Sequence, residues 1–173
     1  MKKISLALLT LAIAAAPAYA ANTITFQGEV SEQTCEVTVN GTASSPIVLL
    51  PTVSTTDLAA SGDTAGQTPF EVGVTGCTAA TTATTITTVF VGNNVADTGN
   101  LTNTGTATNV EVQVLDTASA VIDFSSTYEG DADITLAAGD TAASATYNVQ
   151  YYATGASTAG TVSASLQYAV SYL

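Results

Sequence analysis

The sequence predicts an all-β fold, a two-sheet sandwich of the immunoglobulin type. Apolar and polar residues alternate over many short segments, and no segment repeats convincingly at the 3.6-residue period of a helix. Gly, Asn, Asp and Pro separate these segments, as is typical of tight turns. Eight or nine such strands within about 150 residues favour a sandwich over a larger barrel.

The expected strands follow one another at short intervals along the chain. In order they are Ile24 to Val30, Cys35 to Val39, Ile47 to Leu50, Phe70 to Val74, Ile86 to Val91, Val110 to Leu115, Val121 to Phe124, Ala145 to Ala153 and Val162 to Tyr172. Thr78 to Thr88 is nearly pure Ala and Thr, and we interpret it as a solvated loop that enters a strand.

Residues 1–20 have the pattern of a secretory signal peptide. Lys2 and Lys3 are followed by the apolar segment Ile4 to Ala16 and by Ala18-Tyr19-Ala20, whose small residues are typical of a signal-peptide cleavage site. The alternative is a membrane anchor, but this segment falls short of the roughly 20 residues that span a bilayer. We therefore expect export through the periplasm to the cell surface and a mature chain without membrane insertion.

The charge balance excludes several classes of function. The chain has 14 acidic side chains and two basic ones, Lys2 and Lys3, and it has no histidine. Once these lysines are removed, no cation remains to bind phosphates, which excludes nucleic acid as a partner. Histidine general-base catalysis and lysine Schiff-base chemistry are excluded as well.

Two cysteines, Cys35 and Cys77, have only one possible pairing. In an exported protein an even number of cysteines predicts a disulfide. The alternative is a zinc site or a nucleophilic thiol pair, but no histidine or third cysteine is present to complete a zinc ligand set. We expect the disulfide, with no metal and no cofactor.

Two acidic motifs are candidates for chemistry. Asp97-Thr98-Gly99 matches the Asp-Thr-Gly of aspartic proteases, whose two aspartates share a proton. The cluster from Glu129 to Asp133 offers oxygen ligands for calcium, but it lacks the spacing of an EF-hand loop. Both motifs are also typical of turns, and we expect turns and no enzymatic activity.

The last predicted strand has one apolar face. Val162, Ala164, Leu166, Tyr168, Val170 and Tyr172 alternate with mostly polar residues, and residues 141–173 contain no charged side chain. Natural sheets protect exposed edges with Lys, Pro or an inward charge, and none is available here. Either another strand covers this edge, or the segment is a central strand.

The segment before Cys35 is a possible covering strand. Ile24, Phe26, Gly28 and Val30 alternate with polar residues and lie outside the loop between the cysteines. The segment could therefore leave its own domain and enter a groove in another molecule, where Gly28 would allow close backbone approach. The alternative is an ordinary first strand that pairs within its own domain.

The mature chain resembles the pilin subunits of chaperone–usher fimbriae, most closely the type 1 rod subunit. The resemblance rests on five features in order: Phe26-Gln27-Gly28-Glu29-Val30 before Cys35, Phe70-Glu71-Val72 leading to Cys77, the segment Ala107 to Asp116, Tyr151-Tyr152-Ala153-Thr154-Gly155, and a C-terminus with Gly160 fourteenth from the end and Tyr172 next to last.

The resemblance implies an incomplete immunoglobulin-like sandwich that lacks its last strand. A periplasmic chaperone or a neighbouring subunit would donate that strand to a hydrophobic groove. By position, the donor residues are Ile24, Phe26, Gly28 and Val30. The chaperone and groove residues are Gly160, Val162, Leu166, Tyr168, Val170, Tyr172 and Leu173.

These observations predict a structural subunit of a surface fimbria that polymerises by donor-strand exchange and supports adhesion. We expect a signal peptide at residues 1–20, a donor extension at 21–33 and a pilin domain at 34–173. The partners would be a periplasmic chaperone, an outer-membrane usher and other pilins. The alternatives are a minor or tip-adapter subunit, or a secreted monomeric sandwich that binds a ligand.

Overall fold

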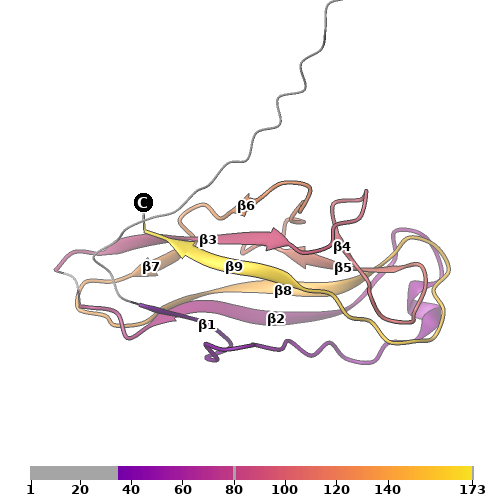
Figure 1. Ribbon diagram of the computed structural model, residues 1–173, viewed down its shortest axis with the longest axis horizontal. Helices are drawn as coiled ribbons and strands as arrows, with labels where there is room; N and C mark the ends of the chain where they lie inside the picture. Colours follow the sequence, from indigo (N-terminus) through magenta and orange to yellow (C-terminus); the bar gives the residue numbers. More distant parts are fainter. Residues whose placement is uncertain (1–34, 80, 173) are drawn as a thin grey trace, which may run out of the picture.

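The computed structural model describes residues 35–79 and 81–172, and this part of the chain forms an all-β sandwich (Figure 1). The strands are β1 (Glu36–Val39), β2 (Thr64–Thr75), β3 (Thr84–Gly92), β4 (Leu101–Thr102), β5 (Val110–Leu115), β6 (Tyr128–Glu129), β7 (Ile134–Leu136), β8 (Ala143–Ala153) and β9 (Leu166–Ser171). One 3-10 helix, η1 (Thr55–Leu58), precedes β2. No helix in the described residues is long and apolar enough to cross a bilayer.

The first sheet is antiparallel, with the strand order β1-β2-β8-β5-β4. The long strands β2 and β8 form its centre, and Phe70 lies opposite Tyr147 in their register. Their alternating side chains place a continuous apolar layer on one face of the sheet.

In the second sheet, β3 pairs antiparallel with β6, β7 and β9. Phe90 in β3 is opposite both Tyr128 in β6 and Tyr168 in β9, so β6 and β9 lie on opposite edges of β3. Among the described strands, β9 pairs with β3 alone. Among the described strands the last strand is therefore an edge strand, as the first of the two alternatives predicts.

Aromatic and branched side chains from both sheets fill the space between them. The ring of Tyr147 stacks on Phe70 with centroids 5.8 Å apart and meets Phe90 edge-on at 5.0 Å. Ile86 and Ile134 are completely buried beside them. Burial of such side chains contributes about 1.5 to 3 kcal/mol each to folding.

The disulfide between Cys35 and Cys77 confirms the predicted pairing. It joins the start of β1 to the residues that follow β2, across a sequence separation of 42. In the chain-entropy account, closing such a loop stabilises a fold by roughly 3 to 4 kcal/mol. No free cysteine is present in the described residues.

The predicted strand from Val121 to Phe124 is wrong. Val121 makes an isolated bridge to Leu115, and Ile122 donates one backbone hydrogen bond to Val114 at 2.9 Å. Ile122 and Phe124 are nevertheless buried. The alternation of apolar residues here indicates that alternate side chains are buried against the first sheet. It does not indicate a β-strand, because the segment forms no continuous ladder of backbone hydrogen bonds.

Other boundaries differ as well. The strand expected from Phe70 begins earlier, at Thr64, because Thr64 and Ala65 still pair with Tyr152 and Tyr151 of β8. Part of the expected Ala- and Thr-rich loop belongs to β3, which begins at Thr84. The short strands β4, β6 and β7 have two or three residues each, too few to show a period.

Candidate functional site

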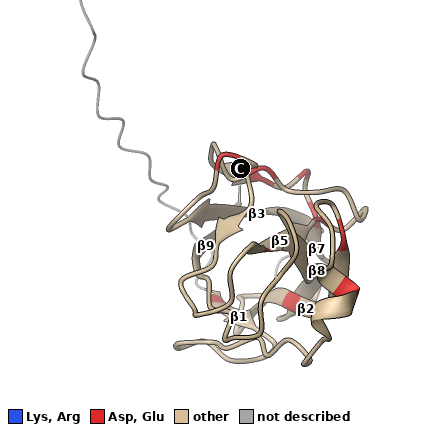
Figure 2. Ribbon diagram, turned by 90° about the vertical axis from the view of Figure 1, so that its right-hand side faces the viewer, with Lys and Arg blue, Asp and Glu red and all other residues tan. Residues whose placement is uncertain are grey.

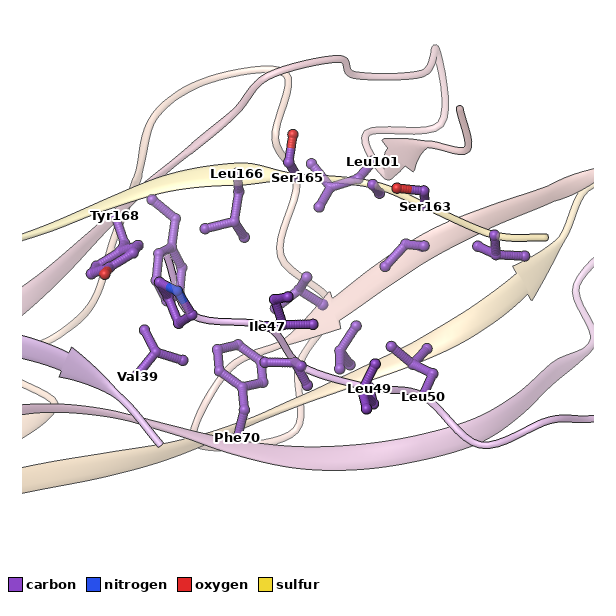
Figure 3. A pocket seen from close by; sticks show the side chains of 18 of the residues that line it. Val39, Ile47, Leu49, Leu50, Phe70, Leu101, Ser163, Ser165, Leu166 and Tyr168 are labelled. Atoms are coloured by element: carbon purple, nitrogen blue, oxygen red, sulfur yellow. The ribbon is translucent and has the colours of Figure 1, made fainter. Parts of the chain in front are cut away.

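An apolar groove with a volume of about 700 Å³ opens along β9 (Figure 3). One wall is β9 with the lead-in segment, residues 161–165. The other wall is the lip segment, residues 46–50. The floor consists of apolar side chains from β2, β5 and β8, namely Phe70, Val72, Val112, Val114 and Val149.

The β9 wall presents alternate side chains to the groove. Val162, Leu166 and Tyr168 line it and are half-buried. Ser163 and Ser165 also border the groove, but they and Gln167 are exposed. The expected strand from Val162 to Tyr172 is shorter in the structure, because the ladder with β3 begins only at Leu166. Val162 and Ala164 make no backbone hydrogen bond within the described part of the chain.

The lip segment is not the strand that the sequence predicts at Ile47 to Leu50. It is extended, but residues 46–50 make no backbone hydrogen bond to any described residue. Val48 and Leu50 pack against the core, whereas Ile47 and Leu49 are 79% and 82% exposed. The apolar pattern is that of a strand, and the pairing partner is missing.

Two tyrosine hydroxyls bind the chain on either side of the lip segment. The Tyr151 hydroxyl donates a hydrogen bond to the Pro51 carbonyl at 3.2 Å, and the Tyr168 hydroxyl reaches the Ala43 carbonyl at 3.5 Å. Burial raises the pKa of Tyr151. The lip segment is thus held across the groove from β9 at both of its ends.

The groove has the shape of a missing strand. The lip segment and Val162 and Ala164 of the lead-in segment face each other above an apolar floor, and their backbone groups have no backbone partner among the described residues. Buried backbone groups normally find partners. An extended peptide with alternate apolar side chains would pair with both walls and fill the floor. The sandwich is therefore incomplete in its second sheet.

The groove is uncharged within a strongly acidic protein. None of its lining residues is charged, while the sequence carries 14 acidic side chains. Figure 2 shows Asp and Glu on several loops and strands, with no Lys or Arg among the described residues. An apolar segment can therefore enter without desolvating a carboxylate.

The structure brings together only part of the predicted site. Val162, Leu166 and Tyr168 line the groove, and Val170 and Tyr172 pack against the core further along the wall. Gly160 lines an adjoining hollow of about 400 Å³. The predicted donor residues Ile24, Phe26, Gly28 and Val30, and also Leu173, lie outside the described residues.

The lip segment is the part of the site that sequence reasoning missed. Its signal is the run of four apolar residues between Pro46 and Pro51, which pattern analysis assigns to an ordinary strand. Only the absence of a pairing partner identifies it as a groove wall, and a single sequence does not contain that information.

The two acidic motifs have structural roles. Asp97-Thr98-Gly99 forms a turn, and the Thr98 hydroxyl donates a hydrogen bond to Glu111 at 2.5 Å. Asp133 accepts hydrogen bonds from the Tyr147 hydroxyl and from the Thr88 backbone amide. The described residues contain no group of three or more side chains that could hold a metal ion.

The fimbrial protein family matches residues 24–173 of the chain. The chain belongs to this family. The F17 fimbrial protein of Escherichia coli is 39% identical to this fimbrial subunit over 99% of both chains. The major fimbrial subunit SMF-1 of Stenotrophomonas maltophilia is 38% identical over 92% of this chain and 99% of its own.

Solved structures show that the fimbrial subunit shares the pilin fold. The P pilus rod subunit PapA superposes with a TM-score of 0.61 at 16% identity, over 80% of this chain and 99% of its own. A subunit of a chaperone–usher pilus gives 0.57 at 18% identity, over 92% of this chain and all of its own. The protein is a pilin, a structural subunit of a fimbria with an incomplete immunoglobulin-like fold.

Proposed function

We propose that this pilin polymerises by donor-strand exchange, in which its groove receives the N-terminal extension, residues 21–33, of a neighbouring copy. The single observation that carries the proposal is the apolar groove, in which the lip segment and Val162 and Ala164 make no backbone hydrogen bond to any described residue. The extension supplies what the groove lacks, because Ile24, Phe26 and Val30 alternate with polar residues at the two-residue period of a strand.

The energetics favour a stable but non-covalent contact. Burial of Ile24, Phe26 and Val30 on the floor contributes roughly 1.5 to 3 kcal/mol each before the cost of ordering the extension. Gly28 allows the donor backbone to approach the walls closely. Main-chain hydrogen bonds to the lead-in and lip segments add affinity that does not depend on sequence.

The route to the surface follows from the same groove. Before assembly, a periplasmic chaperone covers the groove with a strand of its own and contacts Tyr172 and Leu173. At an outer-membrane usher, the extension of the next subunit replaces that strand. The signal peptide that the sequence predicts at residues 1–20 supports this export route.

We further propose that the chain is the repeating subunit of the fimbrial shaft. The named major subunit SMF-1, 38% identical, supports this role. A head-to-tail contact of this kind does not close on itself, so each added subunit offers a new groove and the contact propagates as a filament.

Deleting residues 21–30 tests the proposal. The deletion should leave a folded subunit that binds the chaperone but does not polymerise, because the groove remains while the donor strand is lost. The substitution Phe26→Asp should act in the same way, since it would bury a charge on the apolar floor. Gln27→Asp is the matched control, because it places the same charge on the opposite face of the strand.

The readout is the multimer ladder of surface material on unboiled gels. Loss of the ladder with the deletion and with Phe26→Asp, but not with Gln27→Asp, supports strand exchange. An unstable monomer after the deletion, with an unchanged ladder for Phe26→Asp, would mean that the segment pairs within its own domain and would overturn the proposal.

A further inference from the structure

The lead-in segment, residues 161–165, is held by loops rather than by a β-ladder. Ser163 is the centre of this attachment. The Asn103 side-chain oxygen accepts a hydrogen bond from the Ser163 amide at 2.9 Å, and the Thr104 amide and hydroxyl donate to the Ser163 carbonyl at 2.8 and 3.0 Å. Both backbone groups of Ser163 are thus used on the side away from the groove.

A second asparagine holds the start of β9. The Asn93 side chain donates to the Ser165 hydroxyl at 2.9 Å and accepts from the Gln167 side chain at 2.9 Å. The Asn93 backbone amide also donates to the Ser165 carbonyl at 3.3 Å. Asn93 and Asn103 therefore bind successive residues on the polar face of this wall.

Asn103 also fixes its own loop. Its side-chain oxygen accepts from the Gly105 amide at 2.7 Å, and its side-chain nitrogen donates to the Ala107 carbonyl at 2.8 Å. Gly105 lies so close to the Thr161 carbonyl that a β-carbon there would collide with it. One side chain thus couples the shape of the loop to the position of the groove wall.

The opposite edge of the lead-in segment has no such support. Val162 and Ala164 face the groove and make no backbone hydrogen bond within the described residues. Their amides and carbonyls are the groups that an incoming strand would pair with. Their position before the strand arrives therefore depends on the loop bonds behind them, and a preordered wall lowers the ordering cost of association.

We infer that Asn103, assisted by Asn93, is a positioning residue that sets the groove wall at residues 161–165 for the incoming strand. The inference rests on the proposed function, because it assigns a residue to the uptake step of strand exchange. Once the donor strand has paired with Val162 and Ala164, the wall is held from both edges. Asn103 should then matter for the rate of uptake more than for the stability of the filled subunit.

The test measures uptake of a labelled peptide of residues 21–34 by the mature chain. The chain carries Phe26→Asp, so that its own extension does not fill grooves, and uptake is followed by fluorescence anisotropy. Asn103→Ala should slow uptake about tenfold, because it removes three hydrogen bonds that each contribute a modest net free energy to the position of the wall and its loop. Asn103→Asp keeps the acceptor for the Ser163 amide and should stay within about threefold of the unsubstituted chain.

Further measurements separate positioning from general stability. Asn103→Ala should lower the melting temperature of the peptide-filled subunit less than that of the empty subunit, and the Ser163 amide of the empty subunit should exchange its hydrogen faster. Thr98→Val is the matched control, since it removes a loop hydrogen bond to Glu111 away from the groove wall and should not slow uptake.

Each outcome decides between the proposals. No uptake by the chain with an intact Asn103 contradicts strand exchange itself. If that chain takes up the peptide and Asn103→Ala takes it up at the same rate, the positioning role alone is overturned. The same conclusion follows if Thr98→Val slows uptake as much as Asn103→Ala does. If Asn103→Ala does not fold, Thr104→Val decides, because it removes only the hydroxyl bond to Ser163. It should slow uptake about threefold, and an unchanged rate would overturn the role.

Discussion

At the scale of single residues, Tyr147 connects the core to the acidic loop. Its ring packs between Phe70 and Phe90, and its hydroxyl donates a hydrogen bond to Asp133. Asp133 also accepts from the Thr88 amide at 3.0 Å. The carboxylate that the sequence offers as a calcium ligand therefore serves as the polar partner of a buried tyrosine.

This arrangement makes stability depend on alkaline pH. Burial, followed by the bond to Asp133, raises the pKa of Tyr147 far above its ordinary value of 10. Above pH 10 the unfolded chain releases this proton and the folded chain retains it, so stability is lost as the pH rises. The loss is about 1.4 kcal/mol per pH unit for one proton.

The substitution Tyr147→Phe should remove this part of the pH dependence while lowering stability at neutral pH, because Asp133 loses a partner. Urea unfolding from pH 8 to 12 measures both effects. Tyr152→Phe is the control, since it leaves Tyr147 in place and should keep the alkaline slope. An alkaline slope that is unchanged by Tyr147→Phe would contradict the assignment.

At the scale of elements, the sequence predicts burial better than pairing. The alternation from Val162 to Tyr172 correctly assigns the apolar face of the last wall. Ile47 to Leu50 has an equally good apolar pattern, yet it forms no ladder. A period of two requires only that one face is buried, whereas a strand also requires a neighbouring backbone.

The groove shows why half of the site could not be predicted. One wall was predictable because its edge is apolar, uncharged and unprotected. The lip segment and the loop that holds Ser163 depend on contacts between residues about 60 positions apart or more, such as Asn103 with Ser163. Hydrogen bonds between residues so far apart in the sequence form only once the chain has folded. They produce no periodic pattern of apolar residues in the local sequence.

Gly160 gives a prediction for the element that leads into β9. A β-carbon at Gly160 would lie 2.7 Å from the Ala107 α-carbon, so backbone would have to move. Gly160→Ala should therefore destabilise the subunit by about 1 to 3 kcal/mol, the usual cost of overpacking. Thermal unfolding measures the change.

Gly155→Ala is the matched control for this prediction. A β-carbon at Gly155 would make only ordinary contacts of 3.7 Å or more, with Asn109. This substitution should change stability by less than about 1 kcal/mol. Equal effects of the two substitutions would show that Gly160 is not a point of close backbone approach.

At the scale of the whole molecule, the pilin combines a charge-free groove with an acidic surface. No cationic side chain remains after residue 20, so subunits repel one another over most of their surface. The proposed strand exchange fits this charge distribution, because insertion into the uncharged groove needs no ion pairs. A strand buried among two sheets dissociates slowly, because many hydrogen bonds and apolar contacts break together.

The most direct test of strand exchange is a non-reducing SDS gel of material sheared from the cell surface, loaded with and without boiling. Strand exchange predicts a ladder of multimers in the unboiled lane that collapses to a single band on boiling. A monomer band in both lanes would contradict polymerisation through the groove and favour a secreted monomeric sandwich.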